Sequence, residues 1–378
     1  MLKRYGILII FGFLLTKQGF AQGDLDFRLE DFWKHRESKF TLPLAPQPGE
    51  FITLGTNSAG SGSAYAGCLN DPTAIYLNPA ALTALDGRKL YVEAGYRSEF
   101  DLSIGESQDA LIFPQALSGA ISLGSISIGL GYFCPYYMNT LTNQSGTDET
   151  LSSLNQQRKI DVISFATAYN FKDKLALGIA IFFLNDSWKA NENGATLFDS
   201  QAKGLNIVVG SLLRIVKDID FGMTYMKKSN LIDTQKWSDP LVQVEIKHLV
   251  PARLRMGTSL SLPQNWQLLF DTEKTFWSEI PSLFDTFNNR FQYYLGINKK
   301  FSNRSFRFGF YTRSHPASED LDQKFLTLGF EQKVKKAVIS ISFQDSHLLT
   351  SDKEYLSDLY SIKSVRVSYF SLGISYSL

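Results

Sequence analysis

The sequence predicts an all-β fold, a 14-stranded antiparallel transmembrane β-barrel with an N-terminal hatch segment that plugs its lumen. Three observations predict this fold. The chain begins with an export signal, apolar and polar residues alternate through most of its length, and the connections between the alternating runs are in turn tight and long. The 38 basic residues nearly balance the 37 acidic ones, so the chain lacks the basic footprint of a nucleic-acid-binding protein.

Residues 1–21 have the three-part pattern of a secretory signal peptide. Lys3 and Arg4 precede an apolar run from Tyr5 to Leu15, and small residues allow cleavage after Ala21. A membrane anchor is the alternative, but a spanning helix needs about 20 apolar residues and this run is much shorter. The pattern therefore predicts export. In an exported chain the two cysteines, Cys68 and Cys134, are either free thiols or a disulfide pair, and the sequence leaves both open.

The rest of the chain alternates with a period of two. Near its end, Phe370, Leu372, Ile374 and Tyr376 are separated by small or polar residues. This pattern is typical of strands with one apolar face. Fourteen such runs occur, an even number, as bacterial outer-membrane barrels have. The predicted strands are 89–100, 111–123, 124–138, 157–171, 174–188, 202–216, 217–232, 240–262, 264–278, 291–301, 304–314, 322–333, 336–347 and 362–378.

The connections between these runs favour a membrane barrel over a soluble sheet protein. Six are nearly absent: Leu123-Gly124, Lys172-Asp173, Val216-Lys217, Pro263-Gln264, Ser302-Asn303 and Val334-Lys335. The others are longer, from the link at 315–321 to the loop at 139–156. Short turns at one end and longer loops at the other are typical of outer-membrane barrels. A soluble propeller or sandwich does not need apolar faces on so many long strands, and a sheet in lipid has to close.

Residues 51–85 precede the first strand and have a different character. The glycine-rich run GTNSAGSGSAYA leads into GCLNDPTAIYLNPAALT, where Asn78-Pro79-Ala80 fits neither a regular strand nor a long helix. With the barrel at 86–378, this segment can fold into the lumen as a plug. Asn78, Pro79 and Ala80 are its candidate gating residues, because Asn can bind nearby backbone and Pro fixes φ. Residues 22–50 form an extension, with a short amphipathic pattern at 26–40 and a proline-broken linker at 41–50.

The stretch GSGSAYAGCLNDPTAIYLNPAAL resembles the hatch segment of the FadL family, outer-membrane transporters of long-chain fatty acids and other hydrophobic compounds. The matching residues are Gly60, Gly62, Ala64, Tyr65, Gly67, Asp71 and Asn78-Pro79-Ala80. Residues 250–278 are similar to the family's eighth and ninth strands, with Pro251, Gly257, Trp266 and Asp271 in place. One departure is that the family's long third and fourth extracellular loops correspond to short stretches here, 189–201 and 229–240. This departure puts the identity of the ligand in doubt.

The resemblance implies a multi-pass β-barrel in the bacterial outer membrane that takes up hydrophobic molecules passively, with hydrophobic small molecules or fatty acids and membrane lipid as partners. The alternative is a PorV-like barrel, a relative that shares the Asn-Pro-Ala region and holds exported protein cargo. In that case the partner is a secretion or periplasmic protein. No cofactor or metal is implied by either interpretation.

Charged residues are expected on the lumen side of several strands. Arg253 and Arg255 on the eighth strand face Asp271 and Glu273 on the ninth, and Arg307 and Arg313 lie on the eleventh. One interpretation is a wall of paired charges, because buried charges are usually paired. The other is that one arginine binds the carboxylate of a substrate. The apolar residues expected to line the lumen are Phe182, Leu184, Leu269, Tyr294 and Tyr311.

The third predicted strand, GSISIGLGYFCPYYM, is interrupted by Gly129, Gly131 and Pro135. Pro135 cannot donate a hydrogen bond to a neighbouring strand, so it is expected to break the pairing locally. The resemblance implies that substrate leaves sideways through a gap at this strand. The alternative is a simple bulge near the loop end of the barrel.

No enzymatic activity is expected. The four histidines, His35, His248, His315 and His347, have no serine and carboxylate around them in a pattern that indicates a catalytic triad. His347 lies two residues from Asp345, a spacing more typical of a polar strand end than of a catalytic dyad.

Overall fold

The computed structural model describes residues 53–67, 70–101, 106–107, 111–145, 151–172, 174–192, 195–237, 249–279, 288–314, 322–346, 356–357, 360–361 and 365–378. The predicted signal peptide, the whole extension at 22–50, Cys68 and the four histidines lie outside these residues. No helix in the described part of the chain is long and apolar enough to cross a membrane.

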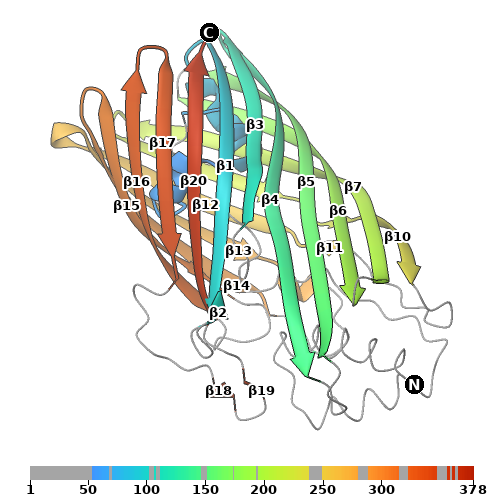
Figure 1. The fold of residues 1–378 in the computed structure, drawn as a ribbon. Coiled ribbons are helices and arrows are strands. Elements are labelled where there is room, and N and C mark those ends of the chain that lie inside the picture. Colours follow the sequence, from blue (N-terminus) through green and yellow to red (C-terminus); the bar gives the residue numbers. More distant parts are fainter. Residues whose placement is uncertain are drawn as a thin grey trace.

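Fourteen long strands form one closed antiparallel barrel (Figure 1). Each strand pairs with its neighbours in chain order, and the pairing of β1 with β20, from Lys89 opposite Ser377 onward, closes the ring. The prediction of fourteen strands is therefore confirmed. The strands are β1 (Arg88–Asp101), β3 (Leu111–Leu123), β4 (Ile126–Ser145), β5 (Leu151–Phe171), β6 (Leu175–Glu192), β7 (Ala195–Val216), β8 (Ile219–Met226), β12 (Arg253–Leu262), β13 (Trp266–Thr275), β14 (Arg290–Lys300), β15 (Arg304–Arg313), β16 (Gln323–Val334), β17 (Ala337–Asp345) and β20 (Val365–Ser377).

Six short strands lie beside this ring. β2 (Glu106–Ser107) pairs with β1, and β10 (Ile232–Trp237) continues the pairing of β7 beyond β8. Two further pairs are β9 (Ser229–Asn230) with β11 (Leu249–Val250), and β18 (Leu356–Ser357) with β19 (Tyr360–Ser361).

The two ends of the barrel differ. The six tight turns lie at one end, here called the turn end, together with Leu378 (Figure 1). Positive φ angles at Gly124, Lys172 and Lys335 make these reversals possible. At the other end, here called the loop end, β4 and β5 reach well beyond the remaining strands (Figure 1), and β4, β5, β6 and β7 are the longest described strands, with 18 to 22 residues each.

Several strand bounds differ from the predicted ones. β4 ends at Ser145 instead of 138, and β6 and β7 leave only residues 193–194 between them, where a longer loop at 189–201 was expected. Polar residues occupy these extra strand positions, and hydrogen bonding between backbones does not require an apolar face. Of the predicted strand at 240–262, residues 240–248 lie outside the described residues. Leu249–Val250 form the short strand β11, and β12 begins at Arg253, after Pro251.

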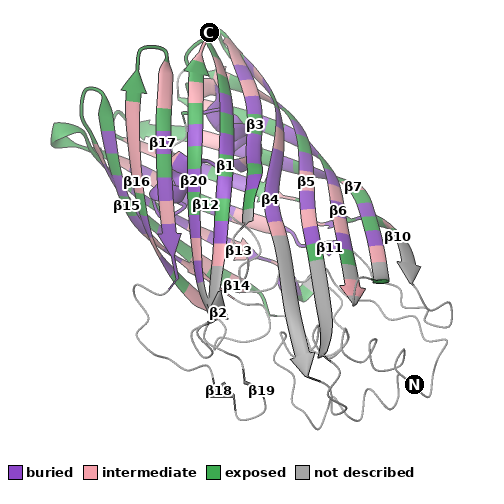
Figure 2. Ribbon diagram, viewed as in Figure 1, coloured by how far each residue is buried: buried purple, intermediate pink, exposed green. Residues whose placement is uncertain are grey.

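The outer face of the barrel is a continuous apolar surface. Along each strand exposed and buried residues alternate (Figure 2), and the exposed ones are mostly large and apolar. Examples from around the ring are Leu90, Leu117, Leu130, Phe165, Phe183, Leu205, Phe270, Leu295, Phe308, Leu328 and Leu372. An apolar surface of this extent is unfavourable in water and matches the lipid-facing band of a membrane barrel.

Residues 53–67 and 70–86, here called the inner segment, lie inside the barrel (Figure 1). They contain α3 (Thr56–Gly60), α4 (Ala74–Leu77) and the 3₁₀ helix η1 (Pro79–Ala84). Asn78 stands before η1 with extended φ and ψ, and its side chain accepts a hydrogen bond from the Ala80 N–H at 3.2 Å. Pro79 follows at the first helical position, where a missing N–H costs nothing. The short lengths of these helices and the Asn78-Pro79 junction between α4 and η1 let this segment turn sharply within the lumen.

Candidate functional site

A ring of glycines on the lumen side of nine strands makes room for the inner segment. A Cβ added at Gly222 lies only 1.6 Å from the Ala66 carbonyl oxygen, and one at Gly309 lies 2.1 Å from the Gly62 nitrogen. No side chain fits at such distances, so only glycine allows the two backbones to approach. The other members of the ring are Gly129, Gly178, Gly210, Gly257, Gly296, Gly329 and Gly373. The barrel wall is thus shaped to the inner segment on most of its circumference.

Asn78, Pro79 and Ala80 lie at the centre of this contact. The Asn78 side-chain amide donates to the Ala66 carbonyl at 2.8 Å and to the Ser211 carbonyl of β7 at 3.3 Å. The side chain is fully buried. Asn78 therefore joins the two halves of the inner segment to each other and to the wall.

Asp71 organises the turn before α4. Its carboxylate accepts from the Thr73 N–H at 2.9 Å, from the Thr73 hydroxyl, and from the Asn57 side-chain amide at 3.1 Å. Asn57 belongs to α3, so Asp71 connects the first helix of the inner segment to the second. Its oxygens are engaged within the inner segment.

Asp271 of β13 fastens the inner segment to the wall. One of its carboxylate oxygens accepts from the backbone N–H groups of Tyr65 and Ala66, at 2.8 and 2.9 Å. The same oxygen accepts from Arg255 Nε of β12 at 2.9 Å. Both side chains are almost fully buried, and hydrogen bonds to a buried carboxylate are among the stronger ones in proteins.

Arg255 has partners on every side. Its guanidinium also lies 3.6 Å from the Glu273 carboxylate and donates to the Ser63 carbonyl. The ring centres of Tyr65 and Tyr294 lie 3.7 and 3.8 Å from the guanidinium carbon. Burial raises the pKa of the Tyr65 phenol to about 12, so the ring stays neutral at physiological pH. Arg255 is therefore held by the protein itself, and its place is between the inner segment and the wall.

The remaining arginines named from the sequence have further partners. Arg307 pairs with Glu331 at 2.7 Å, nearer the turn end. Arg253 donates to the Met226 sulfur at 3.1 Å, and Arg313 lies over the Phe325 ring at 4.5 Å, nearer the loop end. The six predicted charged residues thus lie at several levels of the lumen. Period-two alternation correctly places them on the lumen side but does not reveal these levels.

A band of aromatic rings lines the lumen on the loop-end side of the inner segment. Tyr294 stacks on Tyr311 with ring centres 5.9 Å apart, Tyr311 stacks on Phe325 at 4.7 Å, and Phe325 contacts Tyr369 at 6.1 Å. Farther around the ring, Phe113 meets Tyr137 edge to face at 5.4 Å. These six residues, here called the aromatic band, come from β14, β15, β16, β20, β3 and β4. All but Tyr294 and Tyr311 were missed from the sequence, although each is an aromatic residue at a lumen-side position of its alternating run.

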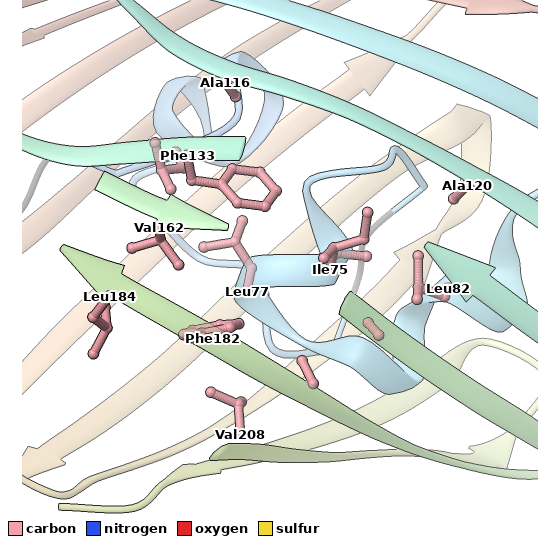
Figure 3. Close-up of a cluster of buried hydrophobic side chains, with 14 of the residues drawn as sticks. Ile75, Leu77, Leu82, Ala116, Ala120, Phe133, Val162, Phe182, Leu184 and Val208 are labelled. Carbon is pink, nitrogen blue, oxygen red and sulfur yellow. The ribbon is translucent and has the colours of Figure 1, made fainter. Parts of the chain in front are cut away.

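Phe182 and Leu184 have a different role from the one expected. They pack against the inner segment in a cluster that includes Ile75, Leu77 and Leu82 (Figure 3). Within it Tyr76 stacks on Phe182 with ring centres 5.0 Å apart and planes within 2° of parallel. These side chains hold the inner segment in place. Of the residues expected to line the lumen, Leu269, Tyr294 and Tyr311 belong to the cluster at the aromatic band.

The pairing between β3 and β4 ends partway along both strands. β4 pairs with β3 only from Ile126 to Phe133, the latter opposite Ala116, whereas it pairs with β5 as far as Ser145. A bulge interrupts the β4 and β5 pairing between Phe133 and Tyr136, so Cys134 and Pro135 occupy the space of one residue. On β3 a second bulge lies against β1 at the same level, between Pro114 and Ala116.

Two contacts span the region beyond this break. The Arg97 guanidinium of β1 donates to the Tyr137 carbonyl of β4 at 3.1 Å, and the rings of Phe113 and Tyr137 touch. Gly129 and Gly131 do not interrupt the strand as expected, since both pair with β3 and β5. A Cβ at Gly129 meets Ile75 at 2.6 Å, and one at Gly131 meets the Phe133 ring at 2.6 Å. Both glycines therefore have packing roles. Pro135 lies well inside β4, not at its rim.

No protein-family model matches the chain, and no curated protein matches it. Solved structures do. A Pseudomonas aeruginosa FadL homologue superimposes with a TM-score of 0.65 at 14% identity, covering 87% of this chain and 99% of that one. The Ralstonia pickettii toluene transporter TbuX gives 0.66 at 17% identity (85% and 97%), and the Pseudomonas putida toluene transporter TodX gives 0.65 at 13% identity (86% and 98%).

The chain has a FadL-type barrel fold. At these identities the likeness concerns the fold alone, and the fold expected from the motifs in residues 60–80 and 250–278 is confirmed. Because the match covers nearly the whole length of each neighbour, it includes the entire FadL-type barrel.

Within this FadL-type barrel, the described residues offer no group of three His, Cys, Asp or Glu side chains that is able to hold a metal ion. Cys134 is a buried free thiol beside Pro135, and its sulfur donates to the Tyr136 carbonyl at 3.4 Å. The chemistry that the described lumen offers is non-covalent: aromatic faces, paired charges and backbone contacts.

Proposed function

We propose that the chain is a bacterial outer-membrane transporter that takes up hydrophobic molecules passively. The closed FadL-type barrel and its apolar outer face support a membrane location, since a barrel leaves no unpaired sheet edge in lipid. Two of the similar structures are described as toluene transporters, which supports a hydrophobic substrate. Monoaromatic hydrocarbons and long-chain fatty acids are the two classes to compare.

The substrate binds at the aromatic band. This is the part of the described lumen where stacked rings gather, from Tyr294 on β14 to Tyr369 on β20, with Arg313 over the Phe325 ring. An alkyl chain gains about 0.8 kcal/mol for each buried methylene, and an aromatic ring adds the geometry of stacking. The band lies on the loop-end side, from which an external molecule arrives.

The inner segment acts as a hatch. It blocks the direct way to the turn end, because the glycine ring brings its backbone against most of the wall. On its turn-end side the lumen wall is polar: Asn298 accepts from Ser61 of the inner segment at 2.8 Å, and Gln267 donates to Ser259 at 2.8 Å. A hydrophobic molecule loses burial on entering such surroundings, so passage straight through the barrel is unfavourable.

Release is sideways, between β3 and β4. The observation that carries this proposal is that their pairing stops at Phe133 and Ala116 while β4 remains paired with β5. Beyond that point no backbone ladder joins the described parts of the two strands. Phe113 and Tyr137 of the aromatic band lie at this break, so a molecule in the band is already next to the opening.

A reversible cross-link tests this route. In a chain with Cys68 and Cys134 changed to serine, cysteines at Phe113 and Tyr137 are joined with a short thiol cross-linker. Uptake of a hydrophobic probe by intact cells should fall at least tenfold on cross-linking and return when a cleavable linker is reduced. The matched control joins Ser122 and Ser127, which already face each other in the paired part of β3 and β4. Full uptake through the cross-linked Phe113 and Tyr137 pair contradicts lateral release.

A further inference from the structure

The first described residues of the inner segment lie closer to the loop end than most of the segment does. Its first residues follow β1 along successive lumen-side positions. Thr56 bonds to the Tyr91 hydroxyl at 3.0 Å through its backbone N–H, and the Gly55 N–H donates to Glu93 at 2.8 Å. The Thr53 carbonyl accepts from Gln115 at 3.3 Å.

The Gln115 side chain lies beside the next lumen-side position of β1, Gly95. A Cβ at Gly95 lies 2.6 Å from the Gln115 side-chain oxygen, so this side chain lies over Gly95. β1 runs from the turn end to the loop end, so residues 91, 93 and 95 lie successively closer to the loop end. Thr56, Gly55 and Thr53 contact these successive levels in turn, so Thr53 lies closer to the loop end than Thr56 does.

A second contact gives the same position for Thr53. Its hydroxyl is 2.6 Å from that of Ser63, whose carbonyl accepts from Arg255 on the side of the aromatic band. Ala64, the next residue, packs in the cluster with Tyr294 and Tyr311. Thr53 is partly exposed, whereas Leu54, Gly55 and Thr56 are buried. Thr53 therefore lies at the edge of the inner segment that faces the aromatic band and the loop end.

The way back to the turn end is occupied. The inner segment meets the glycine positions of nine strands, several at distances that leave no room even for a Cβ. A preceding chain cannot pass this level without displacing the segment. The preceding chain is also long enough to leave the lumen: residues 22–52 span roughly 100 Å when extended, while β4 from Phe133 to Ser145 spans about 40 Å.

We infer that residues 22–52 leave the inner segment toward the loop end and emerge on the outer surface of the cell. This inference depends on the membrane orientation proposed above but not on the identity of the transported molecule.

A protease-accessibility experiment tests it. A tobacco etch virus protease site is inserted in the linker between Pro48 and Gly49 of the full chain. Control sites are placed in the 146–150 connection at the loop end and in the Lys335-Lys336 turn at the turn end. Intact cells and cells with a permeabilised outer membrane are treated with the protease, and cleavage is read on blots. Uptake of a hydrophobic probe is measured in parallel.

The expected result is cleavage in the linker and in the 146–150 connection on intact cells, and cleavage at Lys335-Lys336 only after permeabilisation. Linker cleavage that requires permeabilisation, with both controls as expected, places the extension in the periplasm and overturns the inference. Linker protection under both conditions places the site inside the lumen and also overturns it. If the site at 146–150 is cleaved only after permeabilisation and the site at Lys335-Lys336 is cleaved on intact cells, the proposed orientation of the barrel is contradicted instead. Loss of uptake with both controls as expected contradicts only the proposed transport function. A failure of the inference can therefore be distinguished from a failure of the proposed function.

Discussion

The guanidinium carbon of Arg255 on β12 lies 3.7 Å from the ring centre of Tyr65 in the inner segment. The same carbon lies 3.8 Å from the ring centre of Tyr294, the first ring of the aromatic band. The place where we propose that substrate binds and the segment that we propose acts as a hatch thus share one cation. A ligand that moves Tyr294 changes the surroundings of the contact that holds Tyr65.

Asp271→Asn should destabilise the protein and loosen the inner segment. The change leaves Arg255 with less compensation in a buried site, and breaking a buried pair costs about 3 kcal/mol or more. We expect a lower unfolding temperature in detergent and faster entry of small polar antibiotics into cells. The matched control is Asp199→Asn, which breaks the exposed pair with Lys189 and should change stability by about 0.5 kcal/mol or less. Equal effects of the two variants contradict the role given to Asp271.

Gly222→Ala should reduce the folded fraction of the barrel. The new methyl group meets the Ala66 carbonyl at 1.6 Å, so the inner segment or β8 has to move. Overpacking of this kind typically costs about 1–3 kcal/mol. The control is Gly119→Ala on β3, where the nearest atom is the end of the flexible Leu90 side chain at 3.0 Å. Heat-modifiable migration on gels measures the folded fraction, and an undiminished fraction for Gly222→Ala contradicts a close fit.

Changing Asn78 and Pro79 together to alanine should weaken the hatch and leave the barrel folded. The variant loses the bond from Asn78 to the Ala66 carbonyl and the fixed φ at the start of η1. We expect more leakage of small solutes and altered uptake of a hydrophobic probe. Thr83→Ala, which removes only a local bond to the Ala80 carbonyl, serves as control. Unchanged leakage and uptake show that this segment is not a gate.

Deletion of Pro135 should slow delivery of substrate. It removes the extra residue of the bulge and lets Phe133 and Tyr136 follow the regular alternation opposite Val162 and Ile160. Straightening β4 brings it back toward β3 and narrows the proposed side opening. Binding of a hydrophobic ligand to the purified protein should persist while uptake by cells falls several-fold. Normal uptake by a folded deletion variant argues against this exit.

Cysteines at Ser145 and Asp173 should report the orientation of the barrel. Ser145 ends β4 at the loop end, and position 173 lies in the turn between β5 and β6. In a background without Cys68 and Cys134, an impermeant thiol reagent on whole cells should label the first position and not the second. The opposite labelling pattern inverts the proposed topology.

The sequence by itself determined the strands, the two faces of each strand and the two ends of the barrel. These are local properties: a period of two places Phe308 and Leu372 toward lipid and Arg255 and Tyr311 toward the lumen, and tight turns such as Leu123-Gly124 need only adjacent residues. The compact, turn-prone character of Asn78-Pro79-Ala80 was also readable locally, because Asn and Pro act on their own backbone.

Only the tertiary structure decided which residues meet across the lumen. From the sequence, Gly129 was expected to interrupt its strand, but in the structure it makes room for the Ile75 side chain. Phe182 was expected to line an open lumen, but its ring stacks on Tyr76 of the inner segment. Arg255 and Arg307 have the same local pattern, but one holds the inner segment through Asp271 and the other pairs with Glu331. The physical reason is that alternation fixes the side of a strand on which a residue lies. Its height in the barrel and its partner depend on register, bulges and the path of the inner segment, which form only when all fourteen strands close around it.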